Sequence, residues 1–189
     1  MFQRLHHVAY RCKDAQRTVD FYTKVIGLEY SAGLMAPEGH KHWYYGDDGE
    51  SIHIFFKLAD GTFLAFFELA HAPDEQPDPN TPLWVKHIAF EVPNIAFLEA
   101  AKQRLLDHGV DARGPKDHGI CHSVYFEDPD GHRLEMACRD DKPFMWEGLA
   151  KQASTNLQEW NERKRQRAAR AAVATESATD STTEAATLA

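Results

Sequence analysis

The stretch Lys86–Val92, Lys-His-Ile-Ala-Phe-Glu-Val, decides how the fold is interpreted, because an earlier stretch of the chain repeats its pattern. Leu5–Arg11 reads Leu-His-His-Val-Ala-Tyr-Arg, again a short strand-like run that carries histidine. A helical pattern follows each run, over Asp14–Ile26 and Asn94–His108, and each helix reaches a glycine before an extended segment. The spacing is too long for a solenoid and predicts two copies of one βαβββ module.

This repeat predicts an α+β fold of two paired modules with a C-terminal extension. We expect the first module over residues 5–72 and the second over 86–140. Residues 73–85, rich in proline and acid, are interpreted as a linker. Residues 141–170 are expected to form a helical extension. Residues 171–189 have almost nothing to bury and are expected to form a disordered tail.

The strands expected after each helix follow from turn residues and apolar runs. An Asp-Gly turn at Asp60-Gly61 predicts a hairpin, and an Asp-Pro-Asp-Gly turn begins at Asp128. In the first module we expect strands over Leu28–Leu34, Ser51–Leu58 and Thr62–Ala70. In the second we expect strands over Val110–Arg113, Cys121–Glu127 and His132–Cys138, with Gly114–Ile120 as a loop.

Composition excludes several classes of function. The formal charge of −8 disfavours a nucleic-acid surface, because phosphate binding requires a cationic footprint. We expect no membrane span, since no apolar run approaches the necessary length of about 20 residues. The N-terminus lacks the apolar segment of a secretory signal, and the three cysteines have no CxxC spacing, so we expect a cytoplasmic protein. The eleven histidines are the compositional oddity, because histidine is the commonest metal ligand.

Two histidines and two glutamates occupy what we interpret as matching places in the two modules. His7 and His87 lie in the first strands, and Glu68 and Glu135 lie in the last strands. A strand histidine is more often structural, and a strand glutamate can simply face solvent. A carboxylate within an apolar strand is nevertheless costly unless it is paired or binds a metal. The four together predict a site for a divalent first-row metal with open coordination positions.

The same residues carry a family resemblance. Phe21–Leu28 (Phe-Tyr-Thr-Lys-Val-Ile-Gly-Leu), the two histidine strands and the turn from Asp128 to Gly131 resemble the vicinal oxygen chelate superfamily. Its members include glyoxalase I, extradiol dioxygenases, methylmalonyl-CoA epimerase and fosfomycin-resistance proteins. The resemblance covers roughly Leu5–Cys138. It implies a curved mixed sheet around a metal, with ligand positions matched by His7, Glu68, His87 and Glu135.

An extradiol-type dioxygenase is the first chemistry that the resemblance implies. Such an enzyme cleaves the ring of a catechol-like aromatic with Fe(II), as in aromatic hydrocarbon catabolism, and needs an acid/base near the substrate hydroxyls. His118 and Tyr125 match substrate-contacting positions of small enzymes of this type. An ordinary loop histidine and a packing tyrosine are the alternatives. Glu68 lies near a catalytic position of two-domain relatives, where a fourth protein ligand would crowd the iron. For this chemistry Glu68 is therefore a third catalytic candidate, a group beside the substrate.

A glyoxalase I-like lyase is the second chemistry, acting on a thiohemiacetal. Four protein ligands would hold Zn, Ni or Mn, and a carboxylate ligand would move the substrate proton. Arg11 resembles a residue that holds the glutathione carboxylate, but an expected asparagine is Ala72 here. An epimerase and a metal-free bleomycin-binding protein are further alternatives. In all cases we expect a small-molecule substrate, and a homodimer is compatible with the sequence.

Overall fold

The computed structural model describes residues 3–36, 39, 41, 49–71, 80–82, 84–139 and 143–187, the last range without side chains at 143–145 and 173–187. The chain divides into two compact units, Met1–Asp140 and Asp141–Ala189. Within the described ranges, the helices are all too short or too polar to cross a membrane.

The first module forms a four-stranded sheet in the order β1-β4-β3-β2. β1 is parallel to β4, whereas β4, β3 and β2 pair in antiparallel fashion. Its elements are β1 (His7–Arg11), α1 (Ala15–Asp20), the π-helical turn η1 (Phe21–Ile26), β2 (Glu29–Ala36), β3 (Ser51–Lys57) and β4 (Phe63–Leu69).

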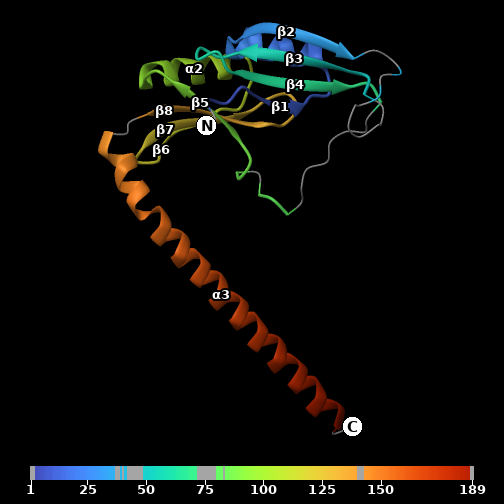
Figure 1. The fold of residues 1–189 in the computed structure, drawn as a ribbon, viewed down its shortest axis with the longest axis vertical. Helices are drawn as coiled ribbons and strands as arrows, with labels where there is room; N and C mark the ends of the chain where they lie inside the picture. Colours follow the sequence, from blue (N-terminus) through green and yellow to red (C-terminus); the bar gives the residue numbers. More distant parts are fainter. Residues whose placement is uncertain are drawn as a thin grey trace. The chain divides into compact units, whose positions relative to one another are not determined.

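The second module repeats this topology with the strand order β5-β8-β7-β6 (Figure 1). Here β5 is parallel to β8, and the remaining pairs are antiparallel. Its elements are β5 (Ile88–Val92), α2 (Ile95–Asp107), β6 (Arg113–Asp117), β7 (Cys121–Glu127) and β8 (Arg133–Arg139). The predicted α+β fold of two βαβββ modules is therefore confirmed.

One strand differs from its prediction. The backbone N–H of Val110 donates to the carbonyl of Leu105, so the chain after α2 is still completing the helix end. β6 consequently begins at Arg113 and includes residues expected to be a loop. Pro115 is tolerated there because β6 is an edge strand, where proline removes no obligatory ladder hydrogen bond.

The helix boundaries follow from capping residues. The carboxylate of Asp14 accepts the N–H of Arg17 at 2.8 Å, and the side chain of Asn94 accepts the N–H of Phe97 at 2.9 Å. Each side chain satisfies a donor that the first helical turn leaves unpaired. Gly27 ends η1 with φ of 90°, a left-handed conformation that glycine adopts without steric cost.

A single hydrophobic core includes residues of both modules. In β4 and β8 alternate side chains enter it, so that one face of each sheet packs inward and the other remains for a site. Each fully buried apolar side chain contributes about 1.5–3 kcal/mol. The core strand residues are Ile54, Phe56, Leu64, Phe66, Val92, Val124, Phe126, Leu134, Met136 and Cys138.

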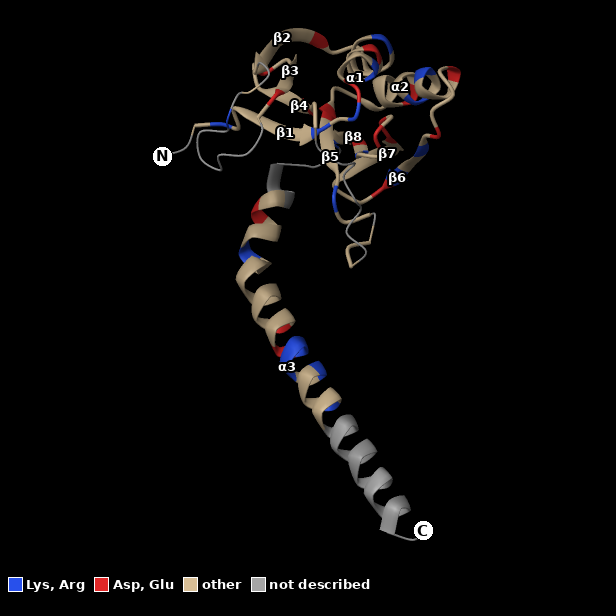
Figure 2. Ribbon diagram, turned by 90° about the vertical axis from the view of Figure 1, so that its right-hand side faces the viewer, with Lys and Arg blue, Asp and Glu red and all other residues tan. Residues whose placement is uncertain are grey.

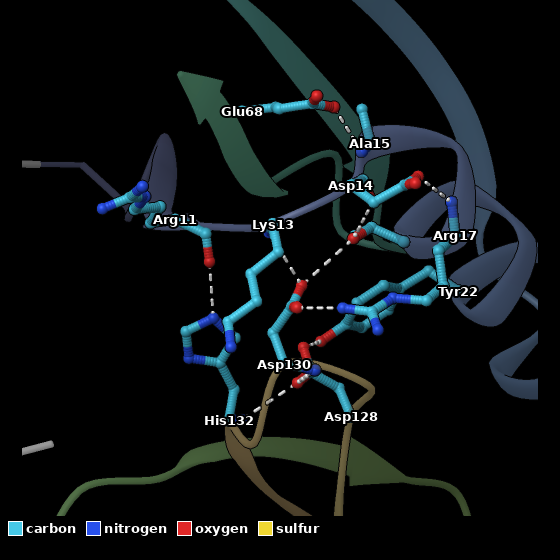
Figure 3. A network of polar contacts seen from close by, with 11 residues as sticks. Arg11, Lys13, Asp14, Ala15, Arg17, Tyr22, Glu68, Asp128, Asp130 and His132 are labelled. Carbon is cyan, nitrogen blue, oxygen red and sulfur yellow. Dashed lines mark hydrogen bonds and ion pairs between the residues drawn. The ribbon is translucent and has the colours of Figure 1, made fainter. Parts of the chain in front are cut away.

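Polar contacts join the two modules at the turn between β7 and β8 (Figure 3). The buried Tyr22 hydroxyl donates to Oδ2 of Asp128 at 2.9 Å, and Oδ1 of Asp128 accepts two backbone N–H groups of the turn. Burial raises the pKa of Asp128. Arg17 forms an ion pair with Asp130 at the same turn. The junction therefore depends on a carboxylate that has its donors supplied from both modules.

The C-terminal unit contains the predicted helix as α3 (Pro143–Thr187). It continues past Arg170 through residues 171–187, for which we expected no regular structure. Basic residues are concentrated over Arg163–Arg170 (Figure 2). Glu159 and Glu162 form ion pairs with Arg163 and Arg165, one turn away. Such pairs stabilise an exposed helix by about 0.2–0.5 kcal/mol each.

Replacing Tyr22 with Phe should lower the free energy of unfolding by about 1–3 kcal/mol, because Oδ2 of the buried Asp128 loses its donor. Urea denaturation measures the change. Tyr30→Phe is the matched control, since the Tyr30 side chain is exposed. Equal stability of the two variants would show that the Tyr22 hydroxyl does not hold the junction.

Candidate functional site

The second module brings two predicted ligands together. Nε2 of His87 lies 3.1 Å from Oε2 of Glu135, whose side chain is only 8% exposed. Register explains the approach, because Glu135 pairs with Ala89, two residues after His87 and on the same face of the sheet. A carboxylate this deeply buried requires a partner. His87 and Glu135 therefore form one half of a candidate metal centre.

Two of the three predicted catalytic residues, His118 and Tyr125, lie beside this pair. Tyr125 is directly opposite Glu135 in the ladder between β7 and β8, and its ring centroid is 6.3 Å from that of His87. The Tyr125 hydroxyl and Nε2 of His118 share a hydrogen bond of 2.9 Å. Burial and the charge of Glu135 raise the pKa of Tyr125. The phenol is therefore held in its protonated form next to the candidate ligands.

Arg133 belongs to the same face and was not predicted from the sequence. Its guanidinium carbon lies 4.6 Å from the ring centroid of Tyr125. Its Nε is buried and has no hydrogen-bond partner among the described residues. The signal was present in His-Arg-Leu-Glu-Met, since strand alternation places Arg133 on the face of Glu135.

The first module carries His7 in an aromatic environment. The ring centroid of His7 lies 5.8 Å from that of Phe55 and 6.0 Å from that of His53. His53 stacks on Phe67 at 3.6 Å, and its buried Nε2 has no partner among the described residues. Burial and the nearby His7 lower the pKa of His53. His53 was also missed, although Ser51-Ile52-His53-Ile54 alternates polar and apolar residues.

Glu68 does not join His7. In β1 and β4, Ala9 pairs with Ala65, whereas in β5 and β8 Ala89 pairs with Glu135. Ala65 is thus the counterpart of Glu135, and the predicted equivalence of Glu68 and Glu135 is wrong. Glu68 lies on the helix-facing side of β4, where its carboxylate accepts the N–H of Ala15 at 2.6 Å at the start of α1 (Figure 3).

Among the described residues, the predicted ligands do not form one complete set. In the part of the chain that the structure describes, no three His, Cys, Asp or Glu side chains converge closely enough to hold a metal ion. His7 therefore remains apart from the pair of His87 and Glu135. The chemistry of the pair, an imidazole and a carboxylate, fits a divalent metal, but two protein ligands alone do not complete a site.

Comparison with known proteins identifies the family. The model of the Glyoxalase/Bleomycin resistance protein/Dioxygenase superfamily matches residues 4–136, which comprise both modules. The chain belongs to this superfamily. Most members of the superfamily are metal-dependent enzymes that act on small molecules, and divalent metals are their usual cofactors.

Relatives within the superfamily differ in activity. A putative ring-cleaving dioxygenase, MhqA of Bacillus subtilis, is 28% identical over 140 residues, which are 72% of this chain but only 40% of that protein. The lactoylglutathione lyase of Pseudomonas aeruginosa is 29% identical over 143 residues, 69% of this chain and 80% of that one. The lactoylglutathione lyase of Escherichia coli O157:H7 is 30% identical over 70% of this chain and 90% of that one.

Solved structures of the superfamily share the fold. A glyoxalase family protein from Enterococcus faecalis is 27% identical with a TM-score of 0.55, over 72% of this chain and 98% of that one. The fosfomycin resistance protein FosX from Listeria monocytogenes, solved with Mn(II) and sulfate, is 21% identical with a TM-score of 0.50. The FosX match covers 73% of this chain and 93% of that one, and it supports the fold alone.

The placement of Glu68 predicts a contrast between two carboxylates. Glu68→Gln should leave metal content unchanged and should lower the free energy of unfolding by about 0.3–1 kcal/mol, because it removes a charge from the N-terminus of α1. Glu135→Gln should instead reduce metal content. Equilibrium dialysis with metal analysis and urea denaturation measure both effects. A Glu68→Gln protein that loses its metal would contradict the placement of this side chain.

Proposed function

We propose that this protein is an extradiol-type dioxygenase that uses Fe(II) to cleave a catechol-like aromatic ring. One observation carries the proposal: Ala65 stands where a fourth ligand would match Glu135. The remaining candidates are His7, His87 and Glu135. Two histidines and one carboxylate with open positions form the ligand set typical of non-haem Fe(II) oxygenases.

A second copy of the chain would complete this set. Because His87 and Glu135 pair within one chain and His7 does not reach them, we place His7 of one protomer against the pair of its partner. Exposed apolar residues support a covered face. Leu34 and Leu69 lie on the same side of the first sheet as His53 and are 60% and 37% exposed. Two protomers that contribute residues to each other's sites are usually related by a twofold axis.

Tyr125 and His118 would act as the general acid and base of the reaction. A catechol must lose hydroxyl protons before its ring is attacked, and a positioned acid/base typically accelerates such a step by about 10²–10⁴-fold. The raised pKa of Tyr125 keeps its hydroxyl available to donate a hydrogen bond to the substrate oxygen. His118, bonded to that hydroxyl, can accept a proton and return it later. A bound Fe(II) supplies Lewis acidity and one-electron chemistry toward dioxygen.

A glyoxalase I-like lyase is the second candidate. Its support is the extent of the match, because the two lactoylglutathione lyases align over 80% and 90% of their length, and MhqA over 40%. Such an enzyme would act on a thiohemiacetal with Zn, Ni or Mn. The first module would then need a carboxylate ligand facing His7, and Ala65 occupies that position.

Metal analysis after anaerobic purification tests the chemistry. We expect Fe(II) in the anaerobically purified protein and a yellow ring-fission product once a catechol and dioxygen are supplied. Prolonged exposure of the resting enzyme to air should oxidise the iron and abolish this activity. His118→Ala should retain iron and lower turnover by about 10²–10⁴-fold, since it removes acid/base help without removing a ligand. Stable zinc or nickel, together with isomerisation of a glutathione hemithioacetal, would refute the dioxygenase and favour the lyase.

Mixed dimers test the sharing of the site between protomers. His7→Ala and Glu135→Ala proteins should each lack metal. After they are unfolded and refolded together, the heterodimer regains one intact site, so we expect about a quarter of the wild-type metal content. In the matched control, His87→Ala and Glu135→Ala proteins are refolded together. Both substitutions damage the pair of His87 and Glu135, so every site in the heterodimer is defective and no metal content should be regained. Equal results for the two mixtures would contradict a shared site.

A further inference from the structure

Arg133 is the strongest unexplained group on the site face. It is a half-buried cation on β8, two residues before Glu135 and on the same side of the strand. No described residue forms an ion pair with it, and its one aromatic contact is the ring of Tyr125. A buried N–H group without an acceptor destabilises the folded protein, and native structures rarely leave one unpaired.

The position of this cation relates it to the candidate ligands. Tyr125 lies between them, because its ring contacts the Arg133 guanidinium and its ladder partner is Glu135. Residues two apart in a strand lie roughly 6–7 Å apart on one face, about the length of an aromatic ring with its substituent. A substrate bound at Glu135 and His87 would therefore have its far end near Arg133.

A hollow of about 820 Å³ adjoins this point. Tyr125 and Arg133 border it, and it continues along Phe126 and Val110, away from His87 and Glu135, which do not line it. Arg113, the other arginine of the hollow, is already paired with Asp111 at 2.9 Å. Among the described residues, Arg133 is thus the arginine of this hollow that has no ion-pair partner.

We propose that Arg133 binds a carboxylate carried by the substrate, so that the protein acts on aromatic acids that bear a catechol. The inference deepens the dioxygenase proposed above and rests on it for the catechol. The carboxylate follows from the side chain itself, because the planar guanidinium presents parallel N–H donors that match two carboxylate oxygens. Stacking on the Tyr125 ring holds the Arg133 guanidinium in one orientation, which reduces the conformational entropy lost when a carboxylate binds.

Binding of three probes to the purified protein tests the proposal. The probes are 3,4-dihydroxybenzoate, catechol and benzoate, titrated calorimetrically into protein loaded with Zn(II), so that no turnover occurs. The wild-type protein should bind 3,4-dihydroxybenzoate about tenfold or more tightly than catechol, since hydrogen bonds to charged groups are the strong ones. Arg133→Met should abolish this difference and leave catechol affinity and metal content unchanged.

Two further variants serve as controls. Arg133→Lys keeps the positive charge without the paired N–H donors of the guanidinium, and it should retain part of the preference for 3,4-dihydroxybenzoate over catechol. This variant also serves as the test if Arg133→Met fails to fold. Arg139→Met removes a positive charge from the same strand, where Arg139 faces Glu91, and should keep the full preference. A wild-type protein without preference for the acid, or a preference that survives Arg133→Met and Arg133→Lys unchanged, overturns the proposal.

The outcomes separate this proposal from the dioxygenase. If metal and catechol bind normally but the acid gains nothing from Arg133, the carboxylate site is refuted and the dioxygenase stands. If the protein takes up no metal yet binds benzoate in a manner that depends on Arg133, the dioxygenase is refuted and the carboxylate site stands.

Discussion

Strand register is the constraint on which the rest of the structure depends. In both modules the last strand is parallel to the first, and its alternate side chains enter a core that the modules share. A shift of one residue would exchange the buried and the functional face of a strand. The burial of Leu64 and Phe66 therefore turns Glu68 toward α1, as surely as the burial of Leu134 and Met136 turns Glu135 toward His87.

Local patterns made most of the fold predictable. The repeated histidine strands, the capping residues Asp14 and Asn94 and the two Asp-Gly turns act within a few residues, so the sequence alone indicates them. The position of β6 was not predicted. Val110 has the apolar character of a strand residue, but its N–H completes the end of α2 by donating to Leu105.

The match between modules also needed long-range information. The sequence pattern alone predicts Glu68, the acid in the last strand of the first module, as the counterpart of Glu135. Counting from the turn glycines gives another answer: Glu135 is four residues after Gly131, and Ala65 is four after Gly61, whereas Glu68 is seven after it. Both glycines have positive φ and hold equivalent turns, so they are the better reference points. This alignment of the two turns places Ala65, not Glu68, opposite Glu135. The main support for a lyase with four protein ligands is thereby lost.

The two halves of the site share a further property. Arg133 beside Glu135 and His53 beside His7 each keep a buried nitrogen without a partner among the described residues. Native structures satisfy nearly all buried polar groups, and exceptions gather where ligands bind. These two nitrogens lie on the sheet faces that carry the candidate ligands, which is consistent with ligand-binding faces on both modules.

A crystal structure of the iron-loaded protein tests the central claim most directly. The account predicts iron bound by His87 and Glu135 of one protomer and His7 of the other, with Ala65 facing an open position and Glu68 still at the start of α1. Iron bound by Glu68, or by residues of one chain alone, would contradict it.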